Sequence, residues 1–503
     1  MTIHSLSRLT RNQRPARPLM PAALKTNHFC KSISYQRLWA GFLLSVFATT
    51  LTSAQIKFTT LLSFDGTNGA NPHYVYLVQG TDGDLYGTTY VSTGSGGTVF
   101  KITTKGVLTT LYTFCPDGEP CLEGAQPEAG LVLATNGNFY GTAANGGANG
   151  FGTVFQVTSA GKVTALHSFD STDGASPEVG LIQASNGDLF GTTSIGGSSD
   201  VGTIFDISTA DKFTSLLNFT GTNGDYPDGR LVQGSDGNFY GTTEEVSSGS
   251  GTVFRMTLAG KLTTLHKFTG TDGAGPTCAL IQASNGNFYG TTQAGGANSG
   301  GTVFQITPAG KLTTLYSFCS KAGCADGANP SAGLIQATDG NLYGTTFSGG
   351  SNETSCNGGC GTIFRITTAG MLTTLYNFCS KSGCVDGSQP MEGLVQDTNG
   401  TLYGLTYYGG TDGLGTVYSL SEGLGAFVET LPTSGKVGAK VAILGTSLTG
   451  ATSVTFDGTE ATFKVISSSE VTTTVPAGAK TGIVQVTTSA GTLSSNVAFV
   501  VTN

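Results

Sequence analysis

A short phrase occurs seven times along this chain: an aromatic residue, then glycine, then Thr-Thr in most copies. Successive aromatic residues are 54, 50, 50, 49, 54 and 60 residues apart. A repeat of about fifty residues is typical of propellers and solenoids, in which each copy is one structural unit that packs on its neighbours. The seven aromatic residues are Tyr86, Tyr140, Phe190, Tyr240, Tyr289, Tyr343 and Tyr403.

Each copy predicts four short strands. In the first copy these lie at 77–79, 85–89, 98–102 and 108–114. An Asp-Gly or Asn-Gly pair separates the first two strands in every copy, and such pairs favour tight hairpins because they accept a positive φ. With only 11% charged residues and 76 glycines, the composition also favours strands and turns over helices.

The third strand alternates in character. Phe100 and Ile102 share one face, and Lys101 between them points to the other. The same order recurs in the other copies, so we expect the aromatic residue inside and the polar residue towards solvent.

The two ends of the repeat region predict how it closes. A fourth-strand sequence, 58–64, precedes any first strand, whereas the last copy has none after Tyr418. We therefore expect the N-terminal strand to complete the last sheet and to close a seven-bladed β-propeller. An open solenoid is the alternative, although it would not need the permuted strand.

The first 54 residues differ from the rest. They hold seven Lys and Arg, no Asp or Glu, and an apolar run at 39–51, which predicts a secretory signal peptide cleaved near Ala54. An uncleaved anchor, and translation from Met20 instead of Met1, remain open.

Without this segment, the chain has 17 Lys and Arg and 32 Asp and Glu, which gives a formal charge of −15. Such an acidic protein repels phosphate backbones, so we expect no nucleic-acid partner.

The repeat resembles a known family in its sequence. The order Gly-Leu-Val-Gln, Asp-Gly-Asp-Leu-Tyr-Gly-Thr-Thr and Gly-Gly-Thr-Val-Phe is similar to the GloVer (Gloeobacter/Verrucomicrobia) tandem repeat of secreted bacterial proteins, over about residues 57–420. The resemblance implies a secreted or surface-displayed, propeller-like protein. It implies no particular reaction and no catalytic residues.

A second pattern begins after the repeats and sets the predicted domains at 55–423 and 424–503. Short alternating strands, such as those around Val441 and Val484, predict a small β-sandwich. The order of this segment is similar to IPT/TIG domains, which implies an immunoglobulin-like fold acting as a spacer or an interaction module.

Antiparallel strands place all the long, variable loops at one end of the predicted propeller. Binding residues concentrate on such loops, where carboxylates could bind cations or sugar hydroxyls. The alternative is that these Asp-Gly-x-x-Pro steps are ordinary turns, and their recurrence favours structure. The candidate binding residues are Asp65, Asp173, Asp272, Asp326, Asp386, Glu244 and Glu245.

Eight cysteines stand in short-range pairs near the same loops, which in an exported chain predicts local disulfides. A zinc site from the last three pairs is an alternative without the usual ligand spacing. Cys278 is left over and is expected to pack near a strand rather than to act as a nucleophile. The predicted pairs are Cys115/Cys121, Cys319/Cys324, Cys356/Cys360 and Cys379/Cys384.

Catalysis has little support. Three histidines remain after processing, and only His73 falls outside a predicted strand. We predict a non-catalytic protein that binds a protein or glycan at the cell surface or outside the cell, as a monomer, without cofactor, metal or membrane span. One alternative is a hydrolase or lyase of carbohydrates that uses loop carboxylates. The other is a structural spacer or matrix protein.

Overall fold

The structure is a computed structural model that describes residues 56–502, apart from 117–120, 246–248, 353–355, 357 and 392. The predicted signal peptide, residues 1–54, and the choice between Met1 and Met20 lie outside the described residues. The described chain is all-β, with two short 3-10 turns, η1 (Ala322–Cys324) and η2 (Ser382–Cys384).

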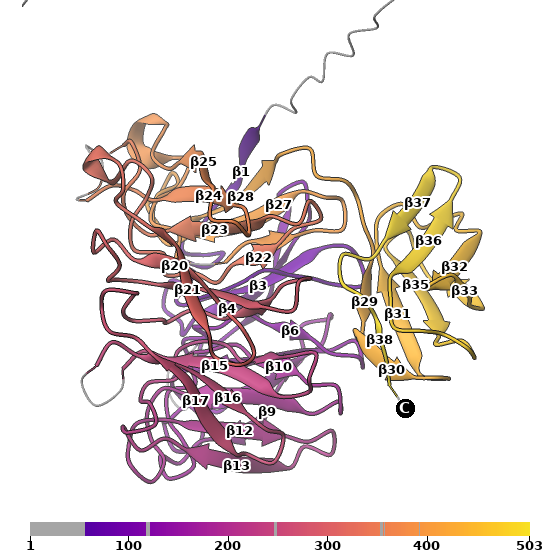
Figure 1. Cartoon of the computed structure of the whole chain (residues 1–503), viewed down its shortest axis with the longest axis horizontal. Helices are drawn as coiled ribbons and strands as arrows, with labels where there is room; N and C mark the ends of the chain where they lie inside the picture. Colours follow the sequence, from indigo (N-terminus) through magenta and orange to yellow (C-terminus); the bar gives the residue numbers. More distant parts are fainter. Residues whose placement is uncertain are drawn as a thin grey trace, which may run out of the picture. The chain divides into compact units, whose positions relative to one another are not determined.

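The repeat region forms seven four-stranded antiparallel sheets (Figure 1). The first contains β2 (Val78–Gln79), β3 (Leu85–Thr89), β4 (Thr98–Ile102) and β5 (Leu108–Thr113). The second and third contain β6 (Val132–Leu133), β7 (Phe139–Ala143), β8 (Thr153–Val157) and β9 (Val163–Ser168), then β10 (Ile182–Gln183), β11 (Leu189–Thr193), β12 (Thr203–Ile207) and β13 (Phe213–Asn218). The fourth and fifth contain β14 (Val232–Gln233), β15 (Phe239–Thr243), β16 (Thr252–Met256) and β17 (Leu262–Lys267), then β18 (Ile281–Gln282), β19 (Phe288–Thr292), β20 (Thr302–Ile306) and β21 (Leu312–Ser317). The sixth contains β22 (Ile335–Gln336), β23 (Leu342–Thr346), β24 (Thr362–Ile366) and β25 (Leu372–Asn377).

The seventh sheet takes its outer strand from the start of the chain. Its order is β26 (Val395–Gln396), β27 (Leu402–Thr406), β28 (Thr416–Ser421) and β1 (Lys57–Ser63). Phe58 of β1 stacks on Tyr376 of the sixth sheet with 3.8 Å between ring centroids. Phe213 stacks in the same way on His167 of the preceding sheet, at 3.7 Å. The N-terminal strand therefore completes the last sheet, as the sequence predicts.

The recurring phrase has a separate role for each of its residues. The aromatic ring packs on the next sheet, as Tyr86 does on Phe139 at 4.1 Å. The glycine leaves room for the third-strand aromatic residue, because a Cβ at Gly87 would lie 2.8 Å from the Phe100 ring. The first threonine, Thr88, donates to a carbonyl of the next copy at 2.9 Å. The phrase therefore joins each sheet internally and to its neighbour.

Glutamines in the first strands also join neighbouring sheets. Gln183 accepts a hydrogen bond from the backbone N–H of Thr135 in the preceding copy, at 2.9 Å. Gln79 of the first copy makes the same contact with Thr398 of the seventh, at 3.1 Å. The first and last copies are therefore joined by the bond that joins internal neighbours.

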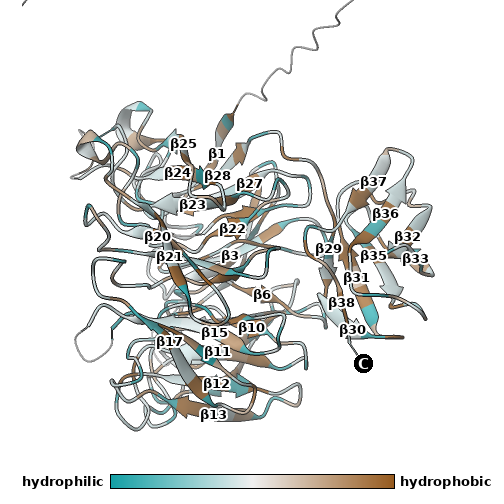
Figure 2. Cartoon of the chain, in the orientation of Figure 1, coloured by the Kyte–Doolittle hydropathy of each residue, from teal (hydrophilic) through white to brown (hydrophobic). Residues whose placement is uncertain are grey.

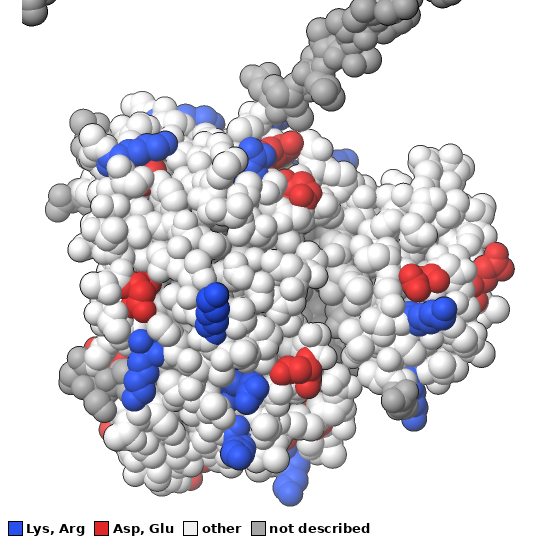
Figure 3. Space-filling view, in the orientation of Figure 1, with Lys and Arg blue, Asp and Glu red and all other residues white. Residues whose placement is uncertain are grey.

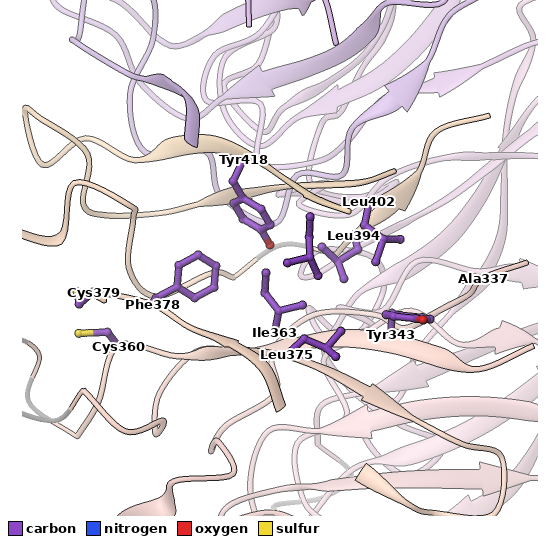
Figure 4. Packing of buried hydrophobic residues seen from close by; sticks show 11 residues of the cluster. Ala337, Tyr343, Cys360, Ile363, Leu375, Phe378, Cys379, Leu394, Leu402 and Tyr418 are labelled. Carbon is purple, nitrogen blue, oxygen red and sulfur yellow. The ribbon is translucent and has the colours of Figure 1, made fainter. Parts of the chain in front are cut away.

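The alternation predicted for the third strand is confirmed. Phe100 and Ile102 are fully buried, and Lys101 is partly exposed. Apolar residues concentrate on the strands (Figure 2). Figure 4 shows one such cluster, in which Tyr343 and Ile363 of the sixth sheet pack near Leu402 and Tyr418 of the seventh.

Residues after the seventh sheet form two further four-stranded antiparallel sheets around one apolar core. One contains β29 (Glu429–Leu431), β31 (Lys440–Leu444), β35 (Glu470–Thr474) and β34 (Phe463–Val465). The other contains β33 (Thr459–Glu460), β32 (Ser453–Phe456), β36 (Val484–Thr488) and β37 (Gly491–Ser494). A parallel pair, β30 (Ser434–Lys436) and β38 (Val500–Thr502), accompanies them.

No helix within the described residues is long and apolar enough to cross a membrane.

Replacing Phe58 with alanine tests whether β1 is an integral part of the seventh sheet. We expect Phe58→Ala to lower the free energy of unfolding by about 2 kcal/mol, because a partly buried aromatic contact is lost. Phe213→Ala, at the matching place in an internal sheet, is the control and should cost a similar amount in denaturant unfolding. A much smaller loss for Phe58→Ala would show that β1 is attached only loosely.

Candidate functional site

The seven copies differ most clearly at two positions. One follows the proline that ends each Asp-Gly-x-x-Pro or similar step, and the other follows the Thr-Thr of the phrase. The residues after the proline are His73, Glu128, Glu178, Asp228, Thr277, Ser331 and Met391. The residues after the Thr-Thr position are Tyr90, Ala144, Ser194, Glu244, Gln293, Phe347 and Tyr407.

The backbone brings these two positions together within each copy. The residue before the proline has a left-handed φ in all seven copies, for example +51° at Ser176 and +52° at Tyr226. Its carbonyl accepts a hydrogen bond from the residue after Thr-Thr, as in Ser194 N to Ser176 O at 3.0 Å and Glu244 N to Tyr226 O at 2.9 Å. An isolated β-bridge joins the same two loops in every copy. The variable loops therefore share one end, as their chain direction predicts.

Residues from both positions line one cavity of about 120 Å³. Glu178, Asp228, Thr277, Ser331 and Met391 come from the position after proline, in five consecutive copies. Glu244 and Gln293 come from the position after Thr-Thr. The site is therefore assembled from copies about fifty residues apart in the sequence.

Tyr76 fills the space beside this cavity. It occupies a position that is glycine in four other copies, and the glycines of the second and seventh copies, Gly130 and Gly393, lie against its ring. A Cβ at Gly130 would lie 2.5 Å from Tyr76 Cδ2, and one at Gly393 would lie 3.0 Å from Tyr76 Cδ1. The Arg230 guanidinium lies over the same ring, 5.1 Å from its centroid. Tyr76 thus gives the cavity an aromatic wall.

The cavity has an unusual electrostatic character. Burial raises the pKa of Glu178 to about 7, and the nearby Glu128 carboxylate raises it further. The pKa of Asp228 is also raised to about 7, chiefly by burial and in addition by the carboxylates of Glu178 and Glu244. A hydrogen bond from the Ser194 hydroxyl opposes this rise. Near neutral pH these two carboxyl groups are therefore poised between their charged and neutral forms.

Two buried oxygen atoms of the cavity lack hydrogen-bond partners. Asp228 Oδ1 and Ser331 Oγ are buried without a hydrogen bond to any described residue. Ser331 is only 3% exposed. Among the described residues that line the cavity, none is Lys, Arg or His. The cavity therefore concentrates negative charge and unpaired oxygen atoms.

The histidine of the variable positions lies beside this cavity rather than in it. His73 Nδ1 is 3.1 Å from Glu128 Oε2. Its ring lies near Tyr90 and Tyr407, at 5.7 and 5.3 Å between centroids. This pair is a second polar feature at the same end of the repeat region.

Most candidate aspartates named from the sequence stabilise their own loops. Asp173 and Asp272 are each 2.8 Å from a histidine Nε2, of His167 and His266 respectively. Asp65 accepts hydrogen bonds from Thr67 and Asn68, two and three residues away. None of these three lines the cavity.

The remaining candidate aspartates have the same structural role. Asp326 and Asp386 are fully buried and accept hydrogen bonds from Tyr316 and Tyr376, both at 2.7 Å. They are absent from the described lining of the cavity. The turn interpretation therefore accounts for these carboxylates.

Of the two candidate glutamates, Glu244 lines the cavity and Glu245 is exposed on the bridged loop. Sequence reasoning missed Glu178, Asp228 and Ser331. The signal that finds them is the residue after each recurring proline, because its character changes from copy to copy while the Gly and the Pro of the step stay the same.

The four predicted cysteine pairs are joined as disulfides. In the first pair, the Cα atoms of Cys115 and Cys121 are 5.2 Å apart. The sequence places this pair near a variable loop, but Cys121 is buried rather than open to solvent, at 7% exposure. Its carbonyl accepts hydrogen bonds from the backbone N–H groups of Gly124 and Gly147, at 3.0 and 2.8 Å. Cys121 therefore holds its loop together from inside and offers no surface to a ligand.

The last two pairs lie close to each other. Cys356, Cys360, Cys379 and Cys384 have sulfur atoms within 4.8 Å of one another, the geometry of a possible metal set. Because these cysteines are bonded in pairs, they offer no thiolate ligands. Cys360 and Cys379 are also buried, so this cluster has a structural role.

The remaining cysteine is part of the cavity. Cys278 is buried and forms no disulfide, and it lies in the cavity wall. Burial raises the pKa of its thiol to about 11. The thiol therefore stays protonated near neutral pH, which agrees with packing rather than nucleophilic chemistry.

Charge on the visible face of the molecule is scattered. Figure 3 shows single Lys, Arg, Asp and Glu side chains among uncharged ones, with no large patch of one sign. Isolated surface charges of this kind are mostly solvated, so the buried carboxylates of the cavity are the more specific feature.

The raised pKa values of Glu178 and Asp228 predict a pH dependence of stability. Their ordinary values are 4.5 and 3.8, so between about pH 4.5 and 7 the folded protein binds more protons than the unfolded chain. Their contribution to stability is therefore fully present below about pH 4, falls as pH rises from about 4.5 to 7, and levels off above 7. We expect Glu178→Gln to remove part of this fall in denaturant unfolding from pH 5 to 8. Glu460→Gln, at an exposed site, should leave it unchanged; equal slopes in both variants would contradict the assignment.

A family model matches the repeats of this chain, and solved structures resemble the chain at low identity. No curated protein matches the chain. A periplasmic gluconolactonase from Pseudomonas aeruginosa is similar at 16% identity, over 67% of this chain and 94% of its own, with a TM-score of 0.41. A fungal alcohol oxidase solved with copper is similar at 13% identity, over 89% and 94%, with a TM-score of 0.44. The family model described as the Gloeobacter/Verrucomicrobia repeat matches residues 45–246, 119–283 and 232–466, and the chain therefore belongs to this repeat family.

Proposed function

We propose that this chain is an exported, non-catalytic binding protein that takes up a protein or glycan ligand at the variable-loop end of its repeats. One observation carries the proposal: positions at which the seven copies differ line a single cavity, whereas residues shared by the copies build the sheets. Binding sites are typically formed by side chains that do not build the scaffold and that lie on loops held by it.

We propose further that residues 55–423 form a closed seven-bladed β-propeller. The N-terminal strand in the seventh sheet and the Gln79–Thr398 contact support closure. The proposed IPT/TIG domain, 424–503, is supported by its two sheets around one core. In this arrangement the cavity lies at the mouth of the central channel and the second domain acts as a spacer.

Export through a signal peptide at 1–54 is part of the proposal. Four short-range disulfides support it, because disulfides persist in oxidising compartments and are rare in the cytosol. The acidic composition of the chain is compatible with this location.

A carbohydrate hydrolase or lyase is the second candidate. The observation in its favour is that Glu178 and Asp228 have pKa values raised to about 7, which suits general acid and base groups near neutral pH. Two carboxyl groups are the usual requirement for glycoside cleavage.

The binding proposal is tested by screening the exported chain on glycan and envelope-protein arrays, with and without calcium. We expect Gly333→Leu, which fills the cavity, to weaken ligand capture at least tenfold. A side chain fits there, because the matching residues in other copies are Tyr76, Arg230 and Ala279. The three atoms nearest to a Cβ at Gly333 all belong to Ala279, and the closest is its backbone oxygen, at 3.3 Å.

Gly425→Leu is the matched control, since a Cβ at Gly425 meets nothing within 4 Å. Ligand capture unaffected by Gly333→Leu would contradict binding at this cavity, and no capture at all would favour a spacer. Turnover of a polysaccharide that is lost in Glu178→Gln, but kept in Glu460→Gln, would favour the enzyme instead.

A further inference from the structure

The carboxylates of the cavity have no cationic partner on its wall. Glu178, Asp228 and Glu244 line it, while the described lining contains no Lys, Arg or His. Outside the lining, Arg230 lies over the Tyr76 ring, and His73 pairs with Glu128 and also lowers the pKa of Glu178 through its charge. Carboxylates buried without a cationic partner are costly, so they take up protons or bind a cation.

The unpaired atoms of the cavity are compatible with a partner that donates hydrogen bonds, because an ionised carboxylate only accepts and a serine hydroxyl can accept as well as donate. More than nine-tenths of buried polar groups in proteins are hydrogen-bonded. Asp228 Oδ1 and Ser331 Oγ are exceptions, and Ser331 is 3% exposed. An ammonium group carries three donors and no acceptor, which matches an ionised carboxylate, a hydroxyl oxygen and a second carboxylate.

The size of the cavity favours the end of a chain over a lone ion. Its volume of about 120 Å³ holds roughly four water molecules. Among the described residues, the one set of three or more side chains close enough to share a metal ion is the cysteine set, not these carboxylates. The spacing of the acids therefore suits a larger cation that is contacted from several sides.

The rest of the wall suits the methylene groups beside such a cation. Val179, Ala279 and Ala332 supply apolar surface. Tyr74 and Tyr76 supply aromatic rings, and ring faces attract ammonium ions. An unbranched aliphatic stem ending in a charged amine matches both parts of the wall.

We propose that this cavity binds a primary ammonium group on a short aliphatic stem. The inference rests on the proposed function and names the ligand chemistry of the same site. The group is supplied either by a free small amine or by a lysine side chain on a protein ligand.

The test is calorimetric titration of the full exported chain with n-butylammonium. We expect saturable binding at pH 8 and at least tenfold weaker binding at pH 5.5, where protons occupy Glu178 and Asp228. Near pH 7, binding should release protons, so the measured heat should change with the ionisation enthalpy of the buffer. The neutral probe 1-butanol should bind at least tenfold more weakly than n-butylammonium at pH 8.

Two variants and a control locate the binding. Asp228→Asn and Ser331→Ala should each weaken n-butylammonium binding, the former at least tenfold, while Glu460→Gln leaves it unchanged. Ser331→Ala removes an unpartnered hydroxyl and should keep its unfolding midpoint, so it remains informative if Asp228→Asn fails to fold. Butanol binding as tight as n-butylammonium, or no saturable amine binding at pH 8, would overturn the inference.

The source of the amine is settled by a second pair of probes. Nα-acetyl-lysine methylamide should compete with n-butylammonium if a lysine side chain is accepted, and its Nε-acetylated form should not. Failure of both peptides beside successful n-butylammonium binding assigns the site to free amines. Macromolecular capture blocked by Gly333→Leu, without any amine binding, would sink this inference and leave the proposed function intact.

Discussion

The sheets of this protein depend on one close contact, between the glycine of each second strand and the aromatic residue of the third. A Cβ at Gly87 or Gly191 would lie 2.8 or 2.5 Å from the ring of Phe100 or Phe205, closer than real Cβ atoms approach. Any other residue there would push the third strand off the second. This contact recurs in all seven copies and explains why the glycine of the phrase never changes.

That constraint divides each copy into fixed and free positions. The aromatic ring, the glycine and the threonines make contacts that are the same in nearly every sheet, so they have little scope for new chemistry. The residue after the recurring proline makes no such contact. Its neighbours on both sides are fixed, by a left-handed residue before the proline and by a buried leucine, such as Leu181, after it. One side chain per copy is thus held in place yet free to differ.

Much of the fold follows from the sequence. The Asp-Gly and Asn-Gly turns, the alternation at Phe100 and Ile102 and the permuted strand at 58–64 identify the strands and their order, because these signals are local. The cysteine pairs are also local, and four short loops close them, although the burial of Cys121 depends on the fold around it. The site was predicted less well: Glu244 was identified, but the aspartates chosen with it, such as Asp326, are bonded within their own loops.

The sequence by itself determined the repeat, the four strands of each copy and the end of the molecule where the variable loops gather. These features depend on neighbours within one copy or on the direction of the chain. Only the tertiary structure decided that Glu178, Asp228 and Glu244 share a cavity with Ser331, and that nothing basic on its described wall faces them. Each of the three acids is a single residue in a loop, and the pKa values of Glu178 and Asp228 depend on burial by other copies. That environment exists only once the copies are packed together.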